Sequence, residues 1–302
     1  MHENIKLATR KSPLALRQAH IVREFLLKNK VFSQIDIIPM STSGDTVSTE
    51  TFKKKGGKGL FLKELESALV NGKAQIAVHS MKDVPARIDK RFFVTSVMKR
   101  EDPVDVFISR SHDSLKSISE GCIGSSSPRR KAIIQNLSQK VNVIEMRGNI
   151  NTRILKLENE GIDGIILAKA GLCRMNMDNL ITEQLCPETF VPAPGQGILC
   201  IECLGKNKKL VDKITKVVDE NTEICALAER MFAAEMNGDC LSPIGAYADI
   251  KNGLMTLRGF VASTDGTKYI KNKVVGDKEE YRELSARLSK VFIKMGSKGL
   301  LK

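Results

Sequence analysis

Short apolar runs that resemble β-strands alternate with helical segments over the first two thirds of the chain. Strand-like runs occupy residues 4–10, 35–41, 74–80, 122–126, 141–147 and 163–171. Apolar residues recur at helical spacing in PLALRQAHIVREFLLKN, where Pro13 suits the first turn, and Ser127 can cap a helix that begins with Pro128. Strands and helices that alternate at these lengths favour parallel sheets with helices on both faces. We therefore expect an α/β fold with two doubly wound domains.

The last third of the chain has a different pattern. TEICALAERMFAAEMNG (222–238) predicts an amphipathic helix, and residues 244–250, 254–263 and 267–276 predict three strands. Asn-Gly and Asp-Gly pairs between the strands are strong hairpin signals. The segment 277–296 then predicts a closing helix. We expect a small α+β domain with a three-stranded antiparallel sheet.

Two stretches have the composition of hinges, KREDPVD (99–105) and VPAPGQG (191–197). The run ILCIECL that follows the second stretch is expected to return to the first sheet. The predicted domains are therefore 1–98 with 197–217, then 103–192, then 220–302.

The amino terminus lacks an apolar signal core, and no apolar run approaches the ~18 residues of a membrane span. We expect a cytoplasmic protein with no membrane partner. Seven cysteines at irregular spacings then argue against disulfides. Cys200 and Cys203 are spaced like a metal or redox pair, but on a strand side chains three apart face opposite ways. No further ligand pair accompanies them, so no metal site is predicted.

The formal net charge is +13, with no Trp and only 5% aromatic residues. A basic protein favours acidic partners, which include nucleic acid and small polycarboxylates. Aromatic platforms for stacking single-stranded bases are scarce here.

Basic residues follow nearly every predicted strand. In open α/β sheets ligands bind beyond the carboxyl ends of the strands, so these positions are candidates for an anion site. Each residue alone is explained as well by ordinary solvation, but the recurrence at successive strand ends favours a carboxylate site. The residues at these strand ends, with the serines beside them, are Arg10, Ser12, Lys82, Ser127, Arg129, Arg130, Arg147, Arg153 and Arg174.

Asp83 is an acid among these cations, on the loop after the run AQIAVHS. A salt bridge to Lys82 or to a nearby arginine would explain it. A functional carboxylate that transfers protons, or stabilises a positive charge on a substrate, would explain it equally well.

Cys240 lies in the stretch EMNGDCLSPIGAY, among loop-forming residues. Free cysteines are more often buried like small hydrophobes, so its place on a loop is unusual.

Common catalytic motifs are absent from this sequence. KKKGGKG (53–59) lacks the spacing of a phosphate-binding loop, and no G-x-G-x-x-G or G-x-S-x-G motif is present. The four histidines have no metal-ligand spacing, and His79 at the end of a buried strand favours a structural role.

Seven stretches between residues 7 and 248 resemble the porphobilinogen deaminase (hydroxymethylbilane synthase) family. They are LATRKSPLALRQA, GGKGLFLKELESALVNGKAQIAVHSMKDVP, REDPVDVF, IGSSSPRRKA, MRGNINTRILKLENEGIDGIILAKAGLCRM, PAPGQGILCIEC and NGDCLSPIGAYA. The resemblance implies two domains like those of type II periplasmic binding proteins and a smaller third domain. It also implies a monomeric transferase of haem and porphyrin biosynthesis.

The activity that the resemblance implies is the head-to-tail condensation of four porphobilinogen molecules with release of ammonia. Hydrolysis then frees hydroxymethylbilane, which passes to the next tetrapyrrole enzyme. Growth starts on a dipyrromethane cofactor, held by a thioether to a cysteine that Cys240 matches.

The resemblance also assigns roles to individual residues. Asp83 matches the catalytic aspartate. Lys82, Ser127, Arg129 and Arg130 match cofactor-binding positions. Arg10, Ser12, Arg147, Arg153, Arg174 and Lys58 match positions that bind the acetate and propionate groups of the substrate.

Two departures from the family pattern are visible. Pro128 stands where an aliphatic residue is common, and Asp239 stands where a small residue is common. Proline is compatible with a first helical turn, so Arg129 and Arg130 should still be presented. Asp239 would repel an anionic cofactor if it faced inward, so we expect it to face solvent or pair with a cation.

A nucleic-acid-binding protein and a non-catalytic small-anion-binding protein are the alternative functions.

Overall fold

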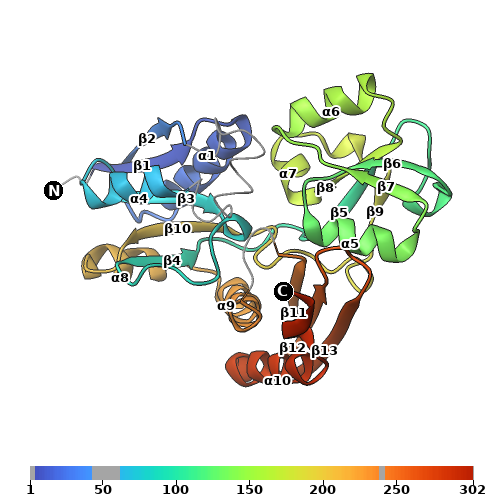
Figure 1. Ribbon diagram of the computed structural model, residues 1–302. Helices are drawn as coiled ribbons and strands as arrows, with labels where there is room; N and C mark the ends of the chain where they lie inside the picture. The colour runs from blue at the N-terminus through green and yellow to red at the C-terminus, as the bar shows by residue number, and fades with distance from the viewer. Residues whose placement is uncertain (1–3, 43–61, 238–241, 302) are drawn as a thin grey trace. The chain divides into compact units, whose positions relative to one another are not determined.

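The computed structural model describes residues 4–42, 62–237 and 242–301. The chain forms two compact units (Figure 1). The first unit comprises residues 1–100 and 198–223, and the second comprises residues 101–197 and 224–302.

The first unit is built on a five-stranded mixed sheet of order β2-β1-β3-β10-β4. Its strands are β1 Asn4–Arg10, β2 Gln34–Met40, β3 Ile76–Ser80, β4 Phe92–Ser96 and β10 Leu199–Leu204. β1 runs parallel to β2 and β3, whereas β10 is antiparallel to both β3 and β4. The expected return of residues 198–204 to the first sheet is confirmed, but its antiparallel direction makes the sheet mixed rather than wholly parallel.

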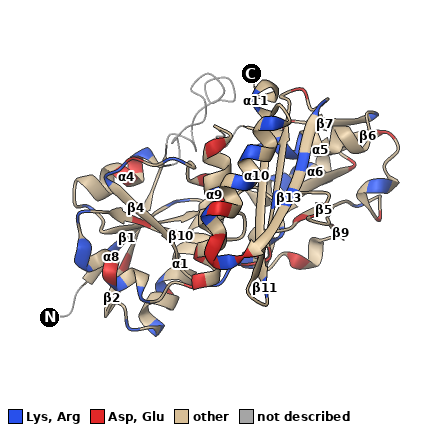
Figure 2. Ribbon diagram, turned by 90° about the horizontal axis from the view of Figure 1, so that it is seen from below, with Lys and Arg blue, Asp and Glu red and all other residues tan. Residues whose placement is uncertain are grey.

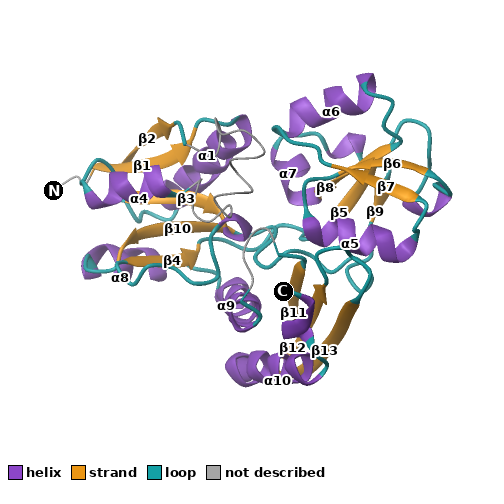
Figure 3. Cartoon of the chain, in the orientation of Figure 1, coloured by secondary structure: helices purple, strands orange, loops and turns teal. Residues whose placement is uncertain are grey.

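Helices cover both faces of this sheet, as expected (Figure 3). They are α1 Pro13–Lys28, α4 Lys63–Val70, α8 Lys208–Thr215 and the short η1 Met81–Asp83. Val22 and Leu26 of α1 and Ile214 of α8 share a core with Leu7 and Val78. On the opposite face, α4 packs through apolar residues against Ala8 and Ala77. Because successive strand residues face opposite ways, each strand contributes to both cores.

The second unit contains a five-stranded mixed sheet of order β7-β6-β8-β5-β9. Its strands are β5 Asp105–Ile108, β6 Gly121–Gly124, β7 Val141–Ile144, β8 Gly164–Ala168 and β9 Glu183–Gln184. The helices are α5 Pro128–Leu137, α6 Ile150–Asn159 and α7 Lys169–Arg174, with the short η2 Leu115–Ser117 and η3 Asp178–Leu180. β6 is parallel to β7 and β8, and β5 is antiparallel to β8 and β9. Helix α5 packs on one face and α6 and α7 pack on the other.

The second unit also holds the predicted antiparallel sheet, β11 Ile244–Lys251, β12 Leu254–Ala262 and β13 Tyr269–Asp277. Asn252 and Gly253 form the first hairpin turn with φ angles of 51° and 79°, the left-handed values that this turn requires. The other described helices are α9 Glu220–Glu235, which belongs to this unit from residue 224, η4 Lys278–Glu280, α10 Tyr281–Lys294 and α11 Ser297–Leu300. The rings of Phe232 and Phe292 pack edge to face on one side of the sheet, with their centroids 4.9 Å apart.

The two sheets of the second unit share a core. Phe260 and Ala262 of β12 belong to the same apolar cluster as Ile133 of α5. The amide of Asn136 also donates to the carbonyl of Gly266 at 2.6 Å. Each predicted domain segment contains one sheet, and the exact domain boundaries stay a prediction.

Candidate active site

In the first unit, four predicted site residues follow two neighbouring parallel strands. Leu7 and Ala8 of β1 pair with Ile76 and Ala77 of β3, so the carboxyl ends of the two strands lie at one sheet edge. Arg10 ends β1 and Ser12 follows it, while Lys82 and Asp83 lie on η1 directly after β3. The sheet therefore brings a half-buried Arg10 to the same edge as the half-buried Asp83.

Ser12 has a structural task in addition to its predicted substrate contact. Its hydroxyl accepts a hydrogen bond from the backbone N–H of Ala15 at 3.4 Å and caps α1, which begins at Pro13. A serine cap followed by proline is a common beginning for a helix, because proline lacks the N–H that would otherwise be unsatisfied.

The turn that carries Asp83 is tied to β10. The N–H of Met81 donates to the carbonyl of Ile198 at 2.9 Å, and the N–H of Val84 donates to the carbonyl of Met81 at 3.1 Å. Ser80, just before the turn, exchanges hydrogen bonds of 3.0 and 3.2 Å with Gln18 of α1. The backbone of the Asp83 turn is thus fixed by two neighbouring elements.

In the second unit, the predicted cations follow three adjacent parallel strands, β7, β6 and β8. Ser127, Arg129 and Arg130 follow β6 at the start of α5. Arg147 and Arg153 follow β7, and Arg174 ends α7 after β8. The strand directions place the segments that carry these residues beyond the same edge of the sheet, as the sequence predicted.

Helix α5 begins as predicted. The Ser127 hydroxyl accepts a hydrogen bond from the N–H of Arg130 at 3.4 Å, and Pro128 occupies the first helical position. Pro128 is therefore compatible with the helix.

Arg129 and Arg130 are both buried, with 3% and 6% of their surface exposed. They share the fully buried carboxylate of Asp105, at 2.8 Å from Arg129 Nη1 and 2.7 Å from Arg130 Nη2. Arg129 also donates to the carbonyl of Val191, and Arg130 donates to that of Ile166, each at 2.7 Å. We call Asp105, Arg129 and Arg130 the buried ion cluster.

The charges within the buried ion cluster shift the pKa values of its members. Burial by itself raises the pKa of Asp105, but Arg129 and Arg130 outweigh it and hold that pKa well below its usual range. Burial lowers the pKa of Arg129, and Asp105 opposes this shift. Gln196 adds a hydrogen bond to Asp105 at 2.9 Å.

Two guanidinium groups facing one carboxylate leave an excess positive charge in the interior. The Nε of Arg129 is buried and has no hydrogen-bond partner within residues 4–42, 62–237 and 242–301. A buried charge is costly unless an opposite charge offsets it, so the buried ion cluster has the electrostatic character of an anion site.

The three remaining arginines of this edge each bind a nearby group. Arg147 donates to the carboxylate of Glu145 at 3.0 Å, and Arg153 donates to the carbonyl of Gly148 at 2.9 Å. Arg174 donates to the carbonyl of Gly197 at 2.6 Å. Burial lowers the pKa of Arg174 to about 10, with Glu101 opposing the shift, so it remains charged at neutral pH.

Two fully buried acids, Asp105 and Glu229, are not among the residues predicted from the sequence. Fully buried Glu229 accepts hydrogen bonds from the N–H groups of Gly195 at 2.7 Å and Ala248 at 2.8 Å, and so holds the segment 191–197. For Asp105 a signal was present, because an acid at the start of the apolar strand DVFI requires a partner.

Two predicted site residues, Lys58 and Cys240, lie outside the described residues, as does the departure Asp239.

The pair Cys200 and Cys203 behaves as a strand pattern predicts. Both are buried on β10, and Cys203 belongs to the core of the α1 face whereas Cys200 points to the other face. Burial, with the charge of Glu202, raises the pKa of Cys203 to about 11, which disfavours the thiolate. Across the described residues, no group of three or more His, Cys, Asp or Glu side chains is arranged to hold a metal ion.

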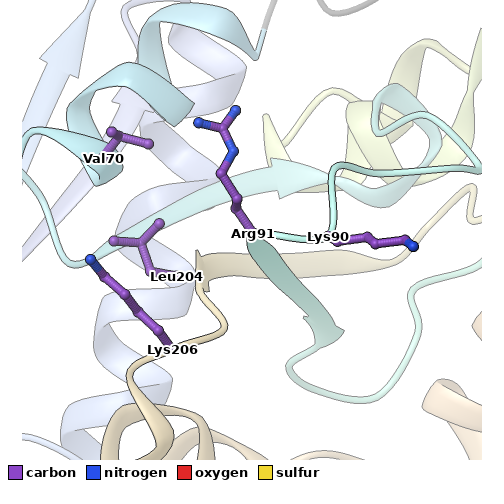
Figure 4. A pocket seen from close by; sticks show the side chains of 5 residues that line it. All are labelled: Val70, Lys90, Arg91, Leu204 and Lys206. Carbon is purple, nitrogen blue, oxygen red and sulfur yellow. The ribbon is translucent and has the colours of Figure 1, made fainter.

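A cavity of about 240 Å³ lies at the opposite edge of the first sheet (Figure 4). Leu204 and Arg91 line it, together with Val70, Lys90 and Lys206. Leu204 pairs with Phe92 at the start of β4, and β10 is antiparallel to β3, so this cavity lies away from Asp83. Arg91 is already bound to Asp89 at 2.8 Å, and the cavity contains none of the predicted site residues.

Two family models match the sequence. Residues 5–212 match the model described as porphobilinogen deaminase, dipyromethane cofactor binding domain, and residues 223–294 match the porphobilinogen deaminase C-terminal domain. The chain belongs to the porphobilinogen deaminase family. Its resemblance to that family, first seen in seven sequence stretches, is confirmed.

Curated members of the family are similar over their full length. The porphobilinogen deaminase of Alkaliphilus metalliredigens is 40% identical over 98% of this chain and 94% of its own. Those of Francisella tularensis subsp. novicida and Stenotrophomonas maltophilia are 40% and 38% identical, with 99% of both chains covered.

Several solved structures are similar to the chain at low sequence identity. A probable extracellular-binding protein of an amino-acid ABC transporter from Bacillus subtilis is 11% identical, covers 77% of this chain and 97% of its own, and has a TM-score of 0.45. A periplasmic domain of BvgS from Bordetella pertussis is 13% identical, covers 76% and 92%, and has a TM-score of 0.44. The fold class rests on the strand orders and directions given above.

We predict that Asp105→Asn lowers the free energy of unfolding by about 3–5 kcal/mol at neutral pH, since two buried guanidiniums lose their anion. Because the pKa of Asp105 is depressed in the folded state, its stabilisation is present above the unfolded pKa of about 3.9. It is lost as pH falls below that value, so wild type and variant converge in acid. Urea denaturation at several pH values measures the difference.

Asp102→Asn is the matched control, since it makes the same chemical change three residues away. Asp102 pairs with Lys169 at 2.7 Å near the surface, where such a pair contributes about 0–1 kcal/mol. Equal losses of stability in the two variants would contradict the account of the buried ion cluster.

Proposed function

We propose that this chain assembles hydroxymethylbilane from four porphobilinogen molecules, with Asp83 as the catalytic carboxylate and Cys240 as the point of cofactor attachment. As a member of its family, the chain is a transferase with porphobilinogen deaminase activity in tetrapyrrole biosynthesis. The observation that carries the proposal is the buried ion cluster, whose excess positive charge suits a ligand rich in carboxylates.

The residues of the cluster fit a dipyrromethane, the cofactor named in the matching family model. Acetate and propionate side chains on its pyrrole rings are anions that a guanidinium binds through both oxygens. The unpartnered Nε of buried Arg129 is a donor directed at no described acceptor. We propose that Lys82, Ser127, Arg129 and Arg130 hold the cofactor, and that Cys240 is its covalent anchor.

When bound, the dipyrromethane supplies the pyrrole carbon to which the first substrate unit is joined. The protein's part is to hold the rings by their carboxylates and to exclude other orientations. Incoming porphobilinogen carries the same two acidic groups. We propose that Arg10, Ser12, Arg147, Arg153, Arg174 and Lys58 bind them.

The role proposed for Asp83 is in the reaction itself rather than in binding carboxylates. Loss of ammonia from the aminomethyl group of porphobilinogen leaves a positively charged carbon, which a nearby carboxylate stabilises. Asp83 protonates the departing amine, stabilises the cation, and accepts the ring proton once the new carbon–carbon bond has formed. One carboxylate suffices because each step moves one proton or one charge.

We propose a cytoplasmic monomer with the three predicted domains, which passes its product to the next tetrapyrrole enzyme. None of the helices in residues 4–42, 62–237 and 242–301 combines the length and the hydrophobicity of a membrane span.

Nucleic-acid binding is disfavoured by the distribution of charge. Lys and Arg are spread over elements of both units (Figure 2), and two of the candidate arginines are buried rather than part of a continuous face. A small-anion-binding protein without catalysis would need no cysteine anchor.

We predict that the intact mass of the purified protein exceeds the sequence mass by two linked pyrrole units, and that Cys240→Ser abolishes this increment. Cys186→Ser is the matched control, because Cys186 is a free and exposed cysteine. It should keep the increment. An unmodified wild-type mass, or an increment retained in Cys240→Ser, would contradict the proposed attachment.

We predict that Asp83→Ala folds and keeps its cofactor but loses about 10²–10⁴-fold in kcat, the usual contribution of a general acid–base group. Asp89→Ala changes an exposed aspartate of the same segment, which binds Arg91, and should leave kcat close to that of wild type. Circular dichroism, intact mass and a product assay measure fold, cofactor and turnover in turn. Near-normal turnover in Asp83→Ala would refute the assignment.

A further inference from the structure

A buried ionisable pair lies in the sheet of the first unit. His79 of β3 and Glu202 of β10 are 7% and 0% exposed, and Nε2 of the histidine is 3.0 Å from Oε2 of the glutamate. The roles proposed above use neither residue.

The register of the sheet explains how the two side chains meet. Cys200 lies opposite His79 and Glu202 lies opposite Ala77, so His79 and Glu202 are diagonal neighbours on one face. That face is covered by α4, where burial and the charge of Glu202 raise the pKa of Glu66, while His79 opposes the shift.

Stability alone does not account for the pair. Replacing both partners of a buried hydrogen bond by apolar groups of the same shape is often nearly neutral or stabilising. Moreover, the second oxygen of Glu202, Oε1, is buried and has no hydrogen-bond partner in the described part of the chain. An apolar pair would fill these positions without that cost.

The position of the pair in the chain points to its role. His79 is followed by Ser80, which binds Gln18, and then by the turn Met81–Asp83. The N–H of Met81 binds the carbonyl of Ile198, immediately before β10 begins. The alignment of β3 with β10 therefore determines where the Asp83 turn begins, and the His79–Glu202 contact joins these two strands.

We propose that the His79–Glu202 pair is a positioning device that fixes the start of the Met81–Asp83 turn and thereby the carboxylate of Asp83. The inference rests on the catalytic role of Asp83 proposed above. His79 and Glu202 are positioning residues, because they act through the backbone of the turn.

The test compares four variants by kcat and KM per cofactor-loaded molecule, together with the melting temperature. Glu202→Leu breaks the pair, Glu202→Gln retains a hydrogen-bond acceptor for His79, and the double variant His79→Leu/Glu202→Leu makes both positions apolar. Ile201→Ala is the control for lost packing, since Ile201 is fully buried on the same strand but faces the other core.

Glu202→Leu should lower kcat by up to about 100-fold, the effect of a displacement of about 1 Å, with KM little changed. Glu202→Gln should have a kcat close to that of wild type, because it still offers His79 a hydrogen-bond acceptor. The double variant should regain the wild-type melting temperature but keep the low kcat, whereas Ile201→Ala should melt earlier with normal kcat.

A double variant with wild-type kcat would overturn the inference. If that variant does not fold, equal kcat in Glu202→Leu and Ile201→Ala would overturn it instead. Asp83→Ala is assayed in parallel to separate the two claims. Full activity there would overturn the proposed catalytic role and the inference with it, whereas an inactive Asp83→Ala beside a fully active double variant would overturn the inference alone.

Discussion

The contact of Asp105 with two buried guanidinium groups is the interaction on which the second unit depends. It joins the first residue of β5 to the first turn of α5, and Gln196 connects it to the segment 191–197. One carboxylate cannot neutralise two guanidiniums, so the folded protein keeps a positive charge where water is scarce. This excess charge is the reason that we propose a negatively charged ligand for the buried ion cluster.

The direction of the parallel strands determines where the other candidate residues lie. Adjacent parallel strands end at the same edge, so Arg10 and Asp83 share an edge of the first sheet, and the arginines after β6, β7 and β8 share an edge of the second. Helix caps fix the neighbouring serines, since Ser12 and Ser127 each accept a backbone hydrogen bond at a helix start. The placement of these cations thus follows from backbone topology.

Local patterns predicted much of this architecture, because their causes are local. Pro13 and Pro128 marked helix starts, Asn252-Gly253 marked a hairpin, and strand alternation separated Cys200 from Cys203. The ends of strands indicated where the cations lie. The partners of Arg130 and His79 were not predictable, because Asp105 and Glu202 are 25 and 123 residues away in sequence. Such pairs depend on strand order and on β10 running antiparallel to its neighbours, which periodicity does not reveal.

We propose that cofactor carboxylates offset the excess charge beside Arg129. The most direct measurement is the rise in melting temperature between cofactor-free and cofactor-loaded protein, with loading checked by intact mass, in wild type and in Arg129→Met. Ligand binding to the folded state stabilises it, so loading should raise the wild-type melting temperature strongly. We expect a much smaller rise in Arg129→Met. An equal rise in both proteins would show that Arg129 does not bind the cofactor carboxylates.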